Sequence, residues 1–152
     1  MADYIGRLRT NYFSVTDAEK FKKIMAQCKA QDTIEVFDEK QEDGSVKYGF
    51  LCDGSIHGLP DTDNEPGENE DECDEEDYDY NYDAFCEALQ EILPDDDAIF
   101  ITEVGYEKMR YLVGECTIIT SSGFKVMTLK NEARSLARIM LNNPEYTTKM
   151  EY

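Results

Sequence analysis

Carboxylates are the side chains with the most evident chemical potential in this sequence, and most of them lie in one stretch. Residues 61–83, DTDNEPGENEDECDEEDYDYNYD, contain 13 Asp or Glu and no Lys or Arg. The nearest cations outside the stretch are Lys47 and Lys108, and 21 carboxylates lie between them. The rest of the chain is nearly neutral, so this block accounts for the net charge of -19. Such a polyanion attracts either metal ions or a basic partner surface.

Calcium binding is the first chemistry that the stretch suggests. Asp61, Asp63, Glu65 and Glu72 fall at positions 1, 3, 5 and 12 of the calcium loop found in EF-hand proteins. Position 6 is Pro66, where that loop needs a glycine to turn sharply, and the proline ring excludes the turn. Zinc ligands at their usual spacing are also missing from the sequence. We therefore expect no specific metal site and no cofactor, and weak binding of divalent cations stays a minor alternative.

Catalysis finds little support in the sequence. His57 is the only histidine, and no Ser or Cys lies within a nucleophile motif. Glycine-rich phosphate-binding motifs do not occur. Acid–base catalysis needs two carboxyl groups held at a fixed separation with unlike pKa values, which a flexible polyanion does not provide. The sequence therefore predicts a protein that is not an enzyme and has no catalytic residues.

Imitation of a nucleic acid is the second chemistry that the acidic stretch suggests. DNA carries one negative charge per ~1.7 Å of its axis. An extended chain that is more than half acidic carries one charge per ~6 Å, because each residue advances ~3.3 Å. Folding the stretch into two arms, or adding the helix face of Glu87 and Glu91 and residues 95–97, would double that density. Interspersed tyrosines suit either stacking on arginine or anchoring of the stretch: Tyr78, Tyr80 and Tyr82.

Composition narrows the class of protein further. A length of 152 residues predicts a single domain over 1–152, and 41% hydrophobic residues are enough for a core. A pI of about 4.2 argues against direct binding of nucleic acid or of an anionic membrane. The five cysteines contain no C-x-x-C pair, and Cys28, Cys86 and Cys116 lie among apolar residues. We interpret them as reduced core thiols of a cytoplasmic protein, and we expect no signal peptide or membrane span.

Hydrophobic periodicity predicts the elements that must position the acidic stretch. A helix that begins with a capping box at Thr16 and Glu19 and a second one capped by Asn81 or Asp83 show apolar residues at helical spacing. A third helix over 130–141 would turn Leu136 and its apolar neighbours inward. Strands are predicted at 8–15, 33–37, 46–52, 98–104, 109–120 and 124–129.

These elements give an α+β fold in which three helices pack on an antiparallel sheet of about six strands, in the order β-α-β-β-loop-α-β-β-β-α. The part of the acidic stretch over 61–77 has no apolar period and almost no hydrophobic residue. Ordering it would cost entropy that no burial offsets, so we expect a mobile loop there.

Two segments of the predicted domain are similar to segments of known proteins. RTNYFSVTDAEKFKKIM at 9–25 and EVGYEKMRYLVGECTIIT at 103–120 resemble segments of a largely uncharacterised family of small acidic proteins. That family is carried by plasmids, phages and conjugative elements of bacteria, with an acidic middle region of variable length. The resemblance implies a role against host defence, in the manner of anti-restriction and anti-CRISPR proteins. Shared residues with polar or aromatic potential are Tyr106, Glu107, Arg110 and Tyr111.

We therefore predict an acidic inhibitor in the cytoplasm of a bacterial host cell. It would bind the basic nucleic-acid-binding surface of a host defence nuclease, such as a CRISPR effector or a restriction enzyme, and exclude DNA or RNA from it. The predicted partner-binding residues are Glu70, Asp71, Glu72, Asp74, Glu75, Glu76, Asp77, Tyr78, Asp79, Tyr80, Asp83 and Glu87.

An alternative interpretation gives the acidic loop no role beyond solubility. The protein would then be a regulatory protein–protein interaction module of a mobile element. Its contact surface would be the sheet or the basic face of the last helix, formed by Lys130, Arg134 and Arg138.

Overall fold

A computed structural model of the chain describes residues 4–60, 80–107 and 111–148. The predicted mobile loop at 61–77 lies outside these ranges. Each helix in the described ranges is too short or too polar to cross a membrane.

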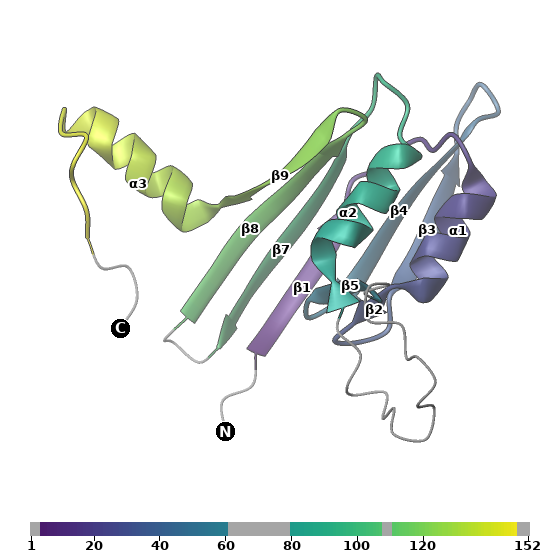
Figure 1. The fold of residues 1–152 in the computed structure, drawn as a ribbon, viewed down its shortest axis with the longest axis horizontal. Helices are drawn as coiled ribbons and strands as arrows, with labels where there is room; N and C mark the ends of the chain where they lie inside the picture. The colour runs from purple at the N-terminus through teal and green to yellow at the C-terminus, as the bar shows by residue number, and fades with distance from the viewer. Residues whose placement is uncertain (1–3, 61–79, 108–110, 149–152) are drawn as a thin grey trace, which may run out of the picture.

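The main element is a six-stranded sheet in which all neighbouring strands are antiparallel (Figure 1). From one edge to the other its strands are β3 (Glu35–Lys40), β4 (Val46–Asp53), β1 (Tyr4–Thr10), β7 (Ile99–Glu107), β8 (Tyr111–Thr120) and β9 (Gly123–Thr128). The N-terminal and C-terminal groups of three strands meet where β1 pairs with β7. The α+β class and the six-stranded antiparallel sheet are therefore confirmed.

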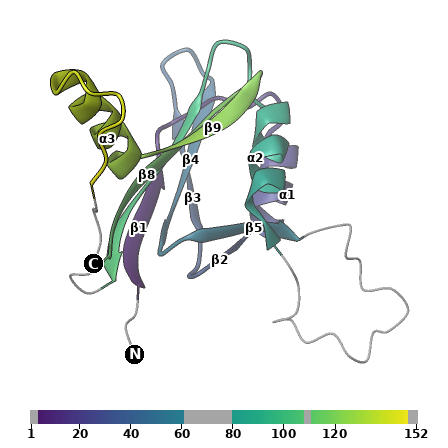
Figure 2. The ribbon, with the colours of Figure 1, turned by 60° about the vertical axis from the view of Figure 1, so that its left-hand side comes forward.

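Two helices cover one face of this sheet. Helices α1 (Ala18–Gln27) and α2 (Tyr82–Glu91) lie side by side on that face, while α3 (Leu129–Met140) lies on the opposite side (Figure 2). Side chains of β7 alternate between the covered and the open face of the sheet: Ile99 and Ile101 are buried under the helices, and Phe100 is exposed on the other face. The core thus occupies a single layer between the sheet and two of the three helices.

Aromatic rings fill the centre of this core. Phe13, Phe21, Phe50 and Phe85 are fully buried. Phe13 meets Phe21 edge to face with ring centroids 5.6 Å apart, and Phe50 meets Phe85 in the same way at 6.0 Å. Such pairs contribute about 0.5–1.5 kcal/mol each beyond the burial of area. They link α1 to the N-terminal segment and α2 to β4.

The first helix begins one residue later than predicted. Asp17, rather than Thr16, is the N-cap, and its side chain accepts a hydrogen bond from the Lys20 backbone N–H at 3.1 Å. Thr16 instead donates its backbone N–H to the Ile92 carbonyl at 2.7 Å, which ties the start of α1 to the end of α2. The predicted capping box was wrong because a tertiary contact occupies the Thr16 backbone.

The first strand is also shifted relative to the prediction. It ends at Thr10, whose hydroxyl accepts the Phe50 backbone N–H at 3.0 Å. Phe13 then forms an isolated bridge with Tyr48, with backbone hydrogen bonds of 2.9 and 2.8 Å. Tyr12 and Phe13, which favoured a strand, therefore lie after it, and of the two only Phe13 enters the core.

A second, small sheet was not predicted. It consists of β2 (Lys29–Ala30), β5 (Ile56–Pro60) and β6 (Tyr80–Asn81), in the order β2-β5-β6. Two of these strands have only two residues, and the third contains Gly58 and Pro60, which normally indicate turns. Their pairing depends on partners distant in sequence, so no local pattern shows it.

The orientation of α3 contradicts the prediction. The predicted inner face comprises Leu129, Ala133, Leu136, Ala137 and Met140. No residue of α3 is buried, and its large apolar side chains are exposed. The face predicted to point outward is instead half-buried: Lys130, Arg134 and Arg138.

The chain that follows α3 explains this reversal. Asn142 turns the chain with φ of +52°, and the segment runs back along the helix. The Arg138 Nε donates to the Tyr146 carbonyl at 2.8 Å, and the Asn143 backbone N–H bonds the Arg138 carbonyl at 3.0 Å. The C-terminal segment therefore covers the basic face and leaves the apolar face open.

Gly58 provides a test of the small sheet. Its φ is +119°, and a Cβ at this position would collide with the Asn81 backbone. We expect Gly58→Ala to lower the free energy of unfolding by about 2–4 kcal/mol, because the backbone strain of alanine at positive φ and the collision of its Cβ with Asn81 add to each other. Urea denaturation measures this loss. Gly44→Ala is the control, since Gly44 also has positive φ but has open space around it, and about 1 kcal/mol is expected there. Equal losses would contradict the close approach of β5 to Asn81.

Candidate functional site

The small sheet attaches the acidic segment to the domain. Leu59 pairs with Asn81 and Pro60 with Tyr80 in an antiparallel ladder between β5 and β6. The two residues that border 61–79 are therefore neighbours in space. We call this region, residues 56–60 and 80–87, the acidic end. It anchors both ends of the charged segment at one place on the domain.

The first turns of α2 add carboxylates to the acidic end. Of the two predicted caps, Asn81 and Asp83, the structure selects Asn81, whose side chain accepts the Ala84 backbone N–H at 3.0 Å. Asp83 and Glu87 are four residues apart, so they share one face of α2, and both are exposed. Asp83 also lies in the first turn, where a negative charge interacts favourably with the helix dipole.

Carboxylates beyond the second turn of α2 have other partners. Glu91 forms an ion pair with Lys20 of α1 at 3.1 Å. Asp97 accepts the Ser14 backbone N–H at 2.7 Å, and Asp95 accepts a hydroxyl of the β8–β9 turn at 2.9 Å. These groups connect elements of the domain at the opposite end of the helix. They do not extend the acidic end, contrary to the sequence-based interpretation.

Three of the predicted partner-binding residues lie in the described part of the chain: Tyr80, Asp83 and Glu87. The structure brings them together at the acidic end. The others lie outside the described residues, and so does the calcium-loop pattern that begins at Asp61: Glu70, Asp71, Glu72, Asp74, Glu75, Glu76, Asp77, Tyr78 and Asp79.

The tyrosines at the border of the segment have different roles. Tyr82 is an anchor, because its hydroxyl lies 2.8 Å from the Thr117 Oγ1 and its ring packs on Phe85 at 6.1 Å. Burial raises the pKa of its phenol, while the hydrogen bond to Thr117 lowers it in part. Tyr80 is half-exposed on β6 and can contact a partner. Anchoring is therefore confirmed for Tyr82.

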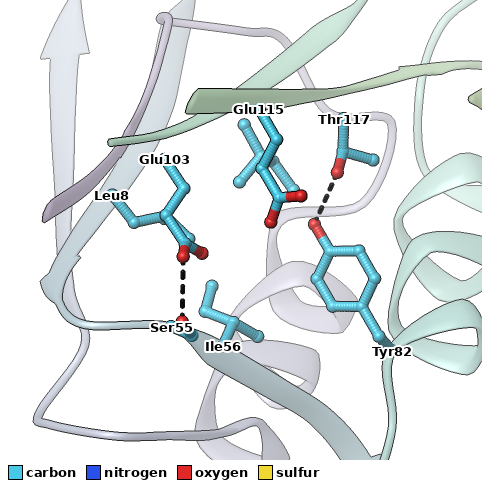
Figure 3. Close-up of a pocket in the computed structure, with 8 residues that line it drawn as sticks. Leu8, Ser55, Ile56, Tyr82, Glu103, Glu115 and Thr117 are labelled. Atoms are coloured by element: carbon cyan, nitrogen blue, oxygen red, sulfur yellow. Dashed lines mark hydrogen bonds between the residues drawn. The ribbon is translucent and has the colours of Figure 1, made fainter. Parts of the chain in front are cut away.

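A cavity of about 130 Å³ with both polar and apolar lining lies beneath the acidic end, between β5, the start of α2 and the sheet (Figure 3). Glu103 and Glu115 are directly opposite each other on β7 and β8, and both carboxylates point into it. The Ser55 hydroxyl donates to Glu103 Oε2 at 2.9 Å. Burial, and then the neighbouring Glu103, raise the pKa of Glu115. This pair was not predicted from the sequence, although strand alternation places Glu103 on the same face as Ile101.

This carboxylate pair satisfies only part of what acid–base catalysis requires. Two carboxyl groups face each other and the pKa of one is raised, which is a pattern found in catalytic sites. The cavity is smaller than the ~300 Å³ at which ligand pockets begin. It has room for a few water molecules rather than for a substrate. The statement that the protein is not an enzyme stays a prediction.

The thiols are not prepared for nucleophilic chemistry. The cysteines in the described ranges are all free: Cys28, Cys52, Cys86 and Cys116. Burial raises the pKa of Cys28 and of Cys86 to about 12, and that of Cys52 to about 11. Because the thiolate is the reactive form, these raised pKa values disfavour nucleophilic chemistry by Cys28, Cys52 and Cys86 at neutral pH. No cluster of three or more potential metal ligands occurs within residues 4–60, 80–107 and 111–148.

The residues from the resembling segments lie elsewhere. Tyr106 is exposed on the face of β7 opposite to α1 and α2, and Glu107 ends that strand with partial exposure. Arg110 and the Tyr111 side chain fall outside the described part of the chain. Tyr106 therefore belongs to a different surface from the acidic end.

Comparisons of the chain with protein-family models, with curated proteins and with solved structures find no match.

The raised pKa of Glu115 predicts a pH-dependent stability. The folded state binds this proton more tightly than the unfolded chain, so stability is present while Glu115 is protonated and is lost as the pH rises through its raised pKa. We expect Glu115→Gln to raise the melting temperature at pH 7 by about 1–3 °C and to leave it unchanged near pH 4. Thermal unfolding at both pH values measures the difference. Glu132→Gln, at an exposed position of α3, is the control. An equal effect of Glu115→Gln on the melting temperature at both pH values would contradict a raised pKa of Glu115 in the folded protein.

Proposed function

We propose that this protein is an acidic inhibitor that competes with nucleic acid for the basic surface of another protein. The observation that carries the proposal is the β5–β6 ladder. It fixes both ends of the acidic segment beside the exposed carboxylates of Asp83 and Glu87. A polyanion that is anchored in this way loses less freedom on binding than a free acidic tail would.

The distribution of charge supports the same function. Within the described ranges, the last helix and the strands before it carry cations as well as anions, whereas residues 48–107 of the sequence contain no Lys or Arg at all. We therefore expect attraction to a basic partner at the acidic end, which lies within this cation-free part of the sequence. Electrostatic steering of this kind raises association rates and weakens with salt.

The class of partner follows from the chemistry. A surface that normally binds DNA or RNA phosphates presents lysine and arginine at high density. The resemblance of residues 9–25 and 103–120 to proteins of bacterial mobile elements indicates host defence nucleases, such as CRISPR effectors and restriction enzymes. Tyr80 adds an aromatic ring that can stack on arginine or occupy a base-binding position.

Neutralising part of the acidic segment tests this proposal. The variant replaces Glu72, Asp74, Glu75 and Glu76 by Gln or Asn. We expect at least a tenfold loss in inhibition of DNA cleavage and an unchanged thermal transition, because these residues belong to no described element. The wild type should also bind its nuclease severalfold or more weakly at ~200 mM salt than at ~50 mM. The assay uses purified defence nucleases, chosen by capture from a bacterial lysate at low salt and release at high salt.

A control with the same change in charge separates local from overall effects. Glu35, Asp38, Glu39 and Glu42 are exposed on β3 and the hairpin that follows it. Neutralising these four should leave inhibition intact. If both variants inhibit as well as the wild type, the acidic segment is not the binding surface. If both lose inhibition equally, only the net charge matters and the anchored geometry has no role.

A further inference from the structure

The apolar face of α3 has no partner in the described part of the chain. Leu136, Ile139 and Met140 are 57%, 75% and 78% exposed. They share one side of the helix with Leu129 at its start. Monomeric proteins rarely leave an apolar surface of this size in water.

The sheet has a second open apolar surface. Alternation along β7 sends Val104 and Tyr106 to the face that α1 and α2 leave uncovered. Tyr106 pairs with Ile5 of β1 on one side and with Leu112 of β8 on the other, so these three side chains form one row. All four are exposed. We call this patch, formed by Ile5, Val104, Tyr106 and Leu112, the outer-face patch.

The two surfaces are continuous. Gly114 pairs with Val104, and a Cβ on Gly114 would lie 3.3 Å from the Leu129 Cβ. The first residue of α3 therefore rests on the sheet beside the outer-face patch. The helix then extends away from that contact (Figure 1).

The described part of the chain covers neither surface. Strand β9 ends at Thr128 and α3 begins at Leu129, so no linker allows the helix to rotate its apolar side onto the sheet. The basic side of α3 is also held by the C-terminal segment through Arg138 and Tyr146. Within the described residues, the apolar side of the helix thus stays open.

We propose that a second copy of this chain covers these surfaces, with α3 of each copy lying on the outer-face patch of the other. One chain supplies both a helix with an apolar face and a sheet face that such a helix fits. A twofold arrangement satisfies both surfaces in both copies at once. The resulting dimer is independent of the proposed inhibitory function.

The available area agrees with a stable dimer. Nine large apolar side chains of α3, its C-cap and the outer-face patch are 46–78% exposed. At roughly 100 Å² for each fully exposed side chain, they offer roughly 550 Å² per copy. Because apolar atoms form about 60% of a typical interface, the whole contact would bury roughly 1,800 Å², which lies in the standard range.

Charge also permits two copies to meet here. Residues 111–148 carry four Lys or Arg and three Glu, so the last two strands and α3 are nearly neutral despite the net charge of -19. The acidic end adjoins α2, on the other side of the sheet (Figure 2). Pairing through the outer face therefore keeps the two acidic ends on opposite sides of the dimer.

Light scattering coupled to size-exclusion chromatography tests the proposal on the full chain. We expect the wild type to have about twice the 17.5 kDa mass of one chain at roughly 10–100 μM, and Leu136→Glu to reduce it to the monomer mass. Because Leu136 is exposed, the thermal transition of that variant at low concentration should match the wild type at the same concentration. Ser135→Glu places the same charge on the adjacent polar position of α3 and should leave the dimer intact.

Mixing variants distinguishes an exchange of helices from other symmetric contacts. Leu136→Glu and Val104→Glu should each be monomeric alone. Their mixture restores one intact helix–sheet contact per pair. We therefore expect a heterodimer that forms at a higher protein concentration than the wild-type dimer, which has two such contacts. A monomeric wild type, or a dimer that survives Leu136→Glu, overturns the proposal. Monomeric single variants whose mixture stays monomeric overturn the helix–sheet exchange.

Discussion

The pairing of β1 with β7 is the constraint on which the structure depends. Seven residue pairs, from Tyr4 with Glu107 to Thr10 with Ile101, join the N-terminal and C-terminal strand groups into one sheet. The pairing sets Leu8 and Ile101 on the same buried face, where the phenylalanines of α1, α2 and β4 complete the core. It also sends Ile5 and Tyr106 together to the other face. A shift of one residue would exchange these faces, so burial of the core fixes the register.

Covering only one face of the sheet has two consequences. On the covered side, α2 and the small sheet fix the ends of the acidic segment and enclose Glu103 and Glu115. On the other side, apolar residues stay exposed beside α3. The chain thus separates a charged surface from an apolar one by the thickness of a sheet. Two kinds of association, one electrostatic and one apolar, can then proceed without interference.

The acidic end combines exposed carboxylates with a firmly anchored backbone. Tyr82 and Asn81 hold the junction through the Thr117 hydroxyl and the Ala84 backbone, while Asp83 and Glu87 stay in solvent. The Glu103–Glu115 pair lies directly beneath. Burial and the nearby Glu103 carboxylate raise the pKa of Glu115, and the Ser55 hydroxyl donates to Glu103. The two carboxyl groups are therefore held close together near the proposed binding surface rather than in the aromatic core.

The sequence alone determined the class of fold and the location of the charge. Phe21, Ile24 and Met25 recur at helical spacing, and residues of β7 alternate between buried and exposed positions, because local burial patterns follow local geometry. The tertiary structure alone decided the β5–β6 ladder, the Asp17 cap, the Glu103–Glu115 pair and the orientation of α3. Each of these depends on a contact between residues distant in sequence, such as Thr16 with Ile92 or Glu103 with Ser55. For α3 the helix and its apolar face were predicted correctly. An amphipathic pattern, however, shows only that one face needs to be covered and does not show what covers it. The C-terminal segment occupies the basic side, and so the apolar side faces outward.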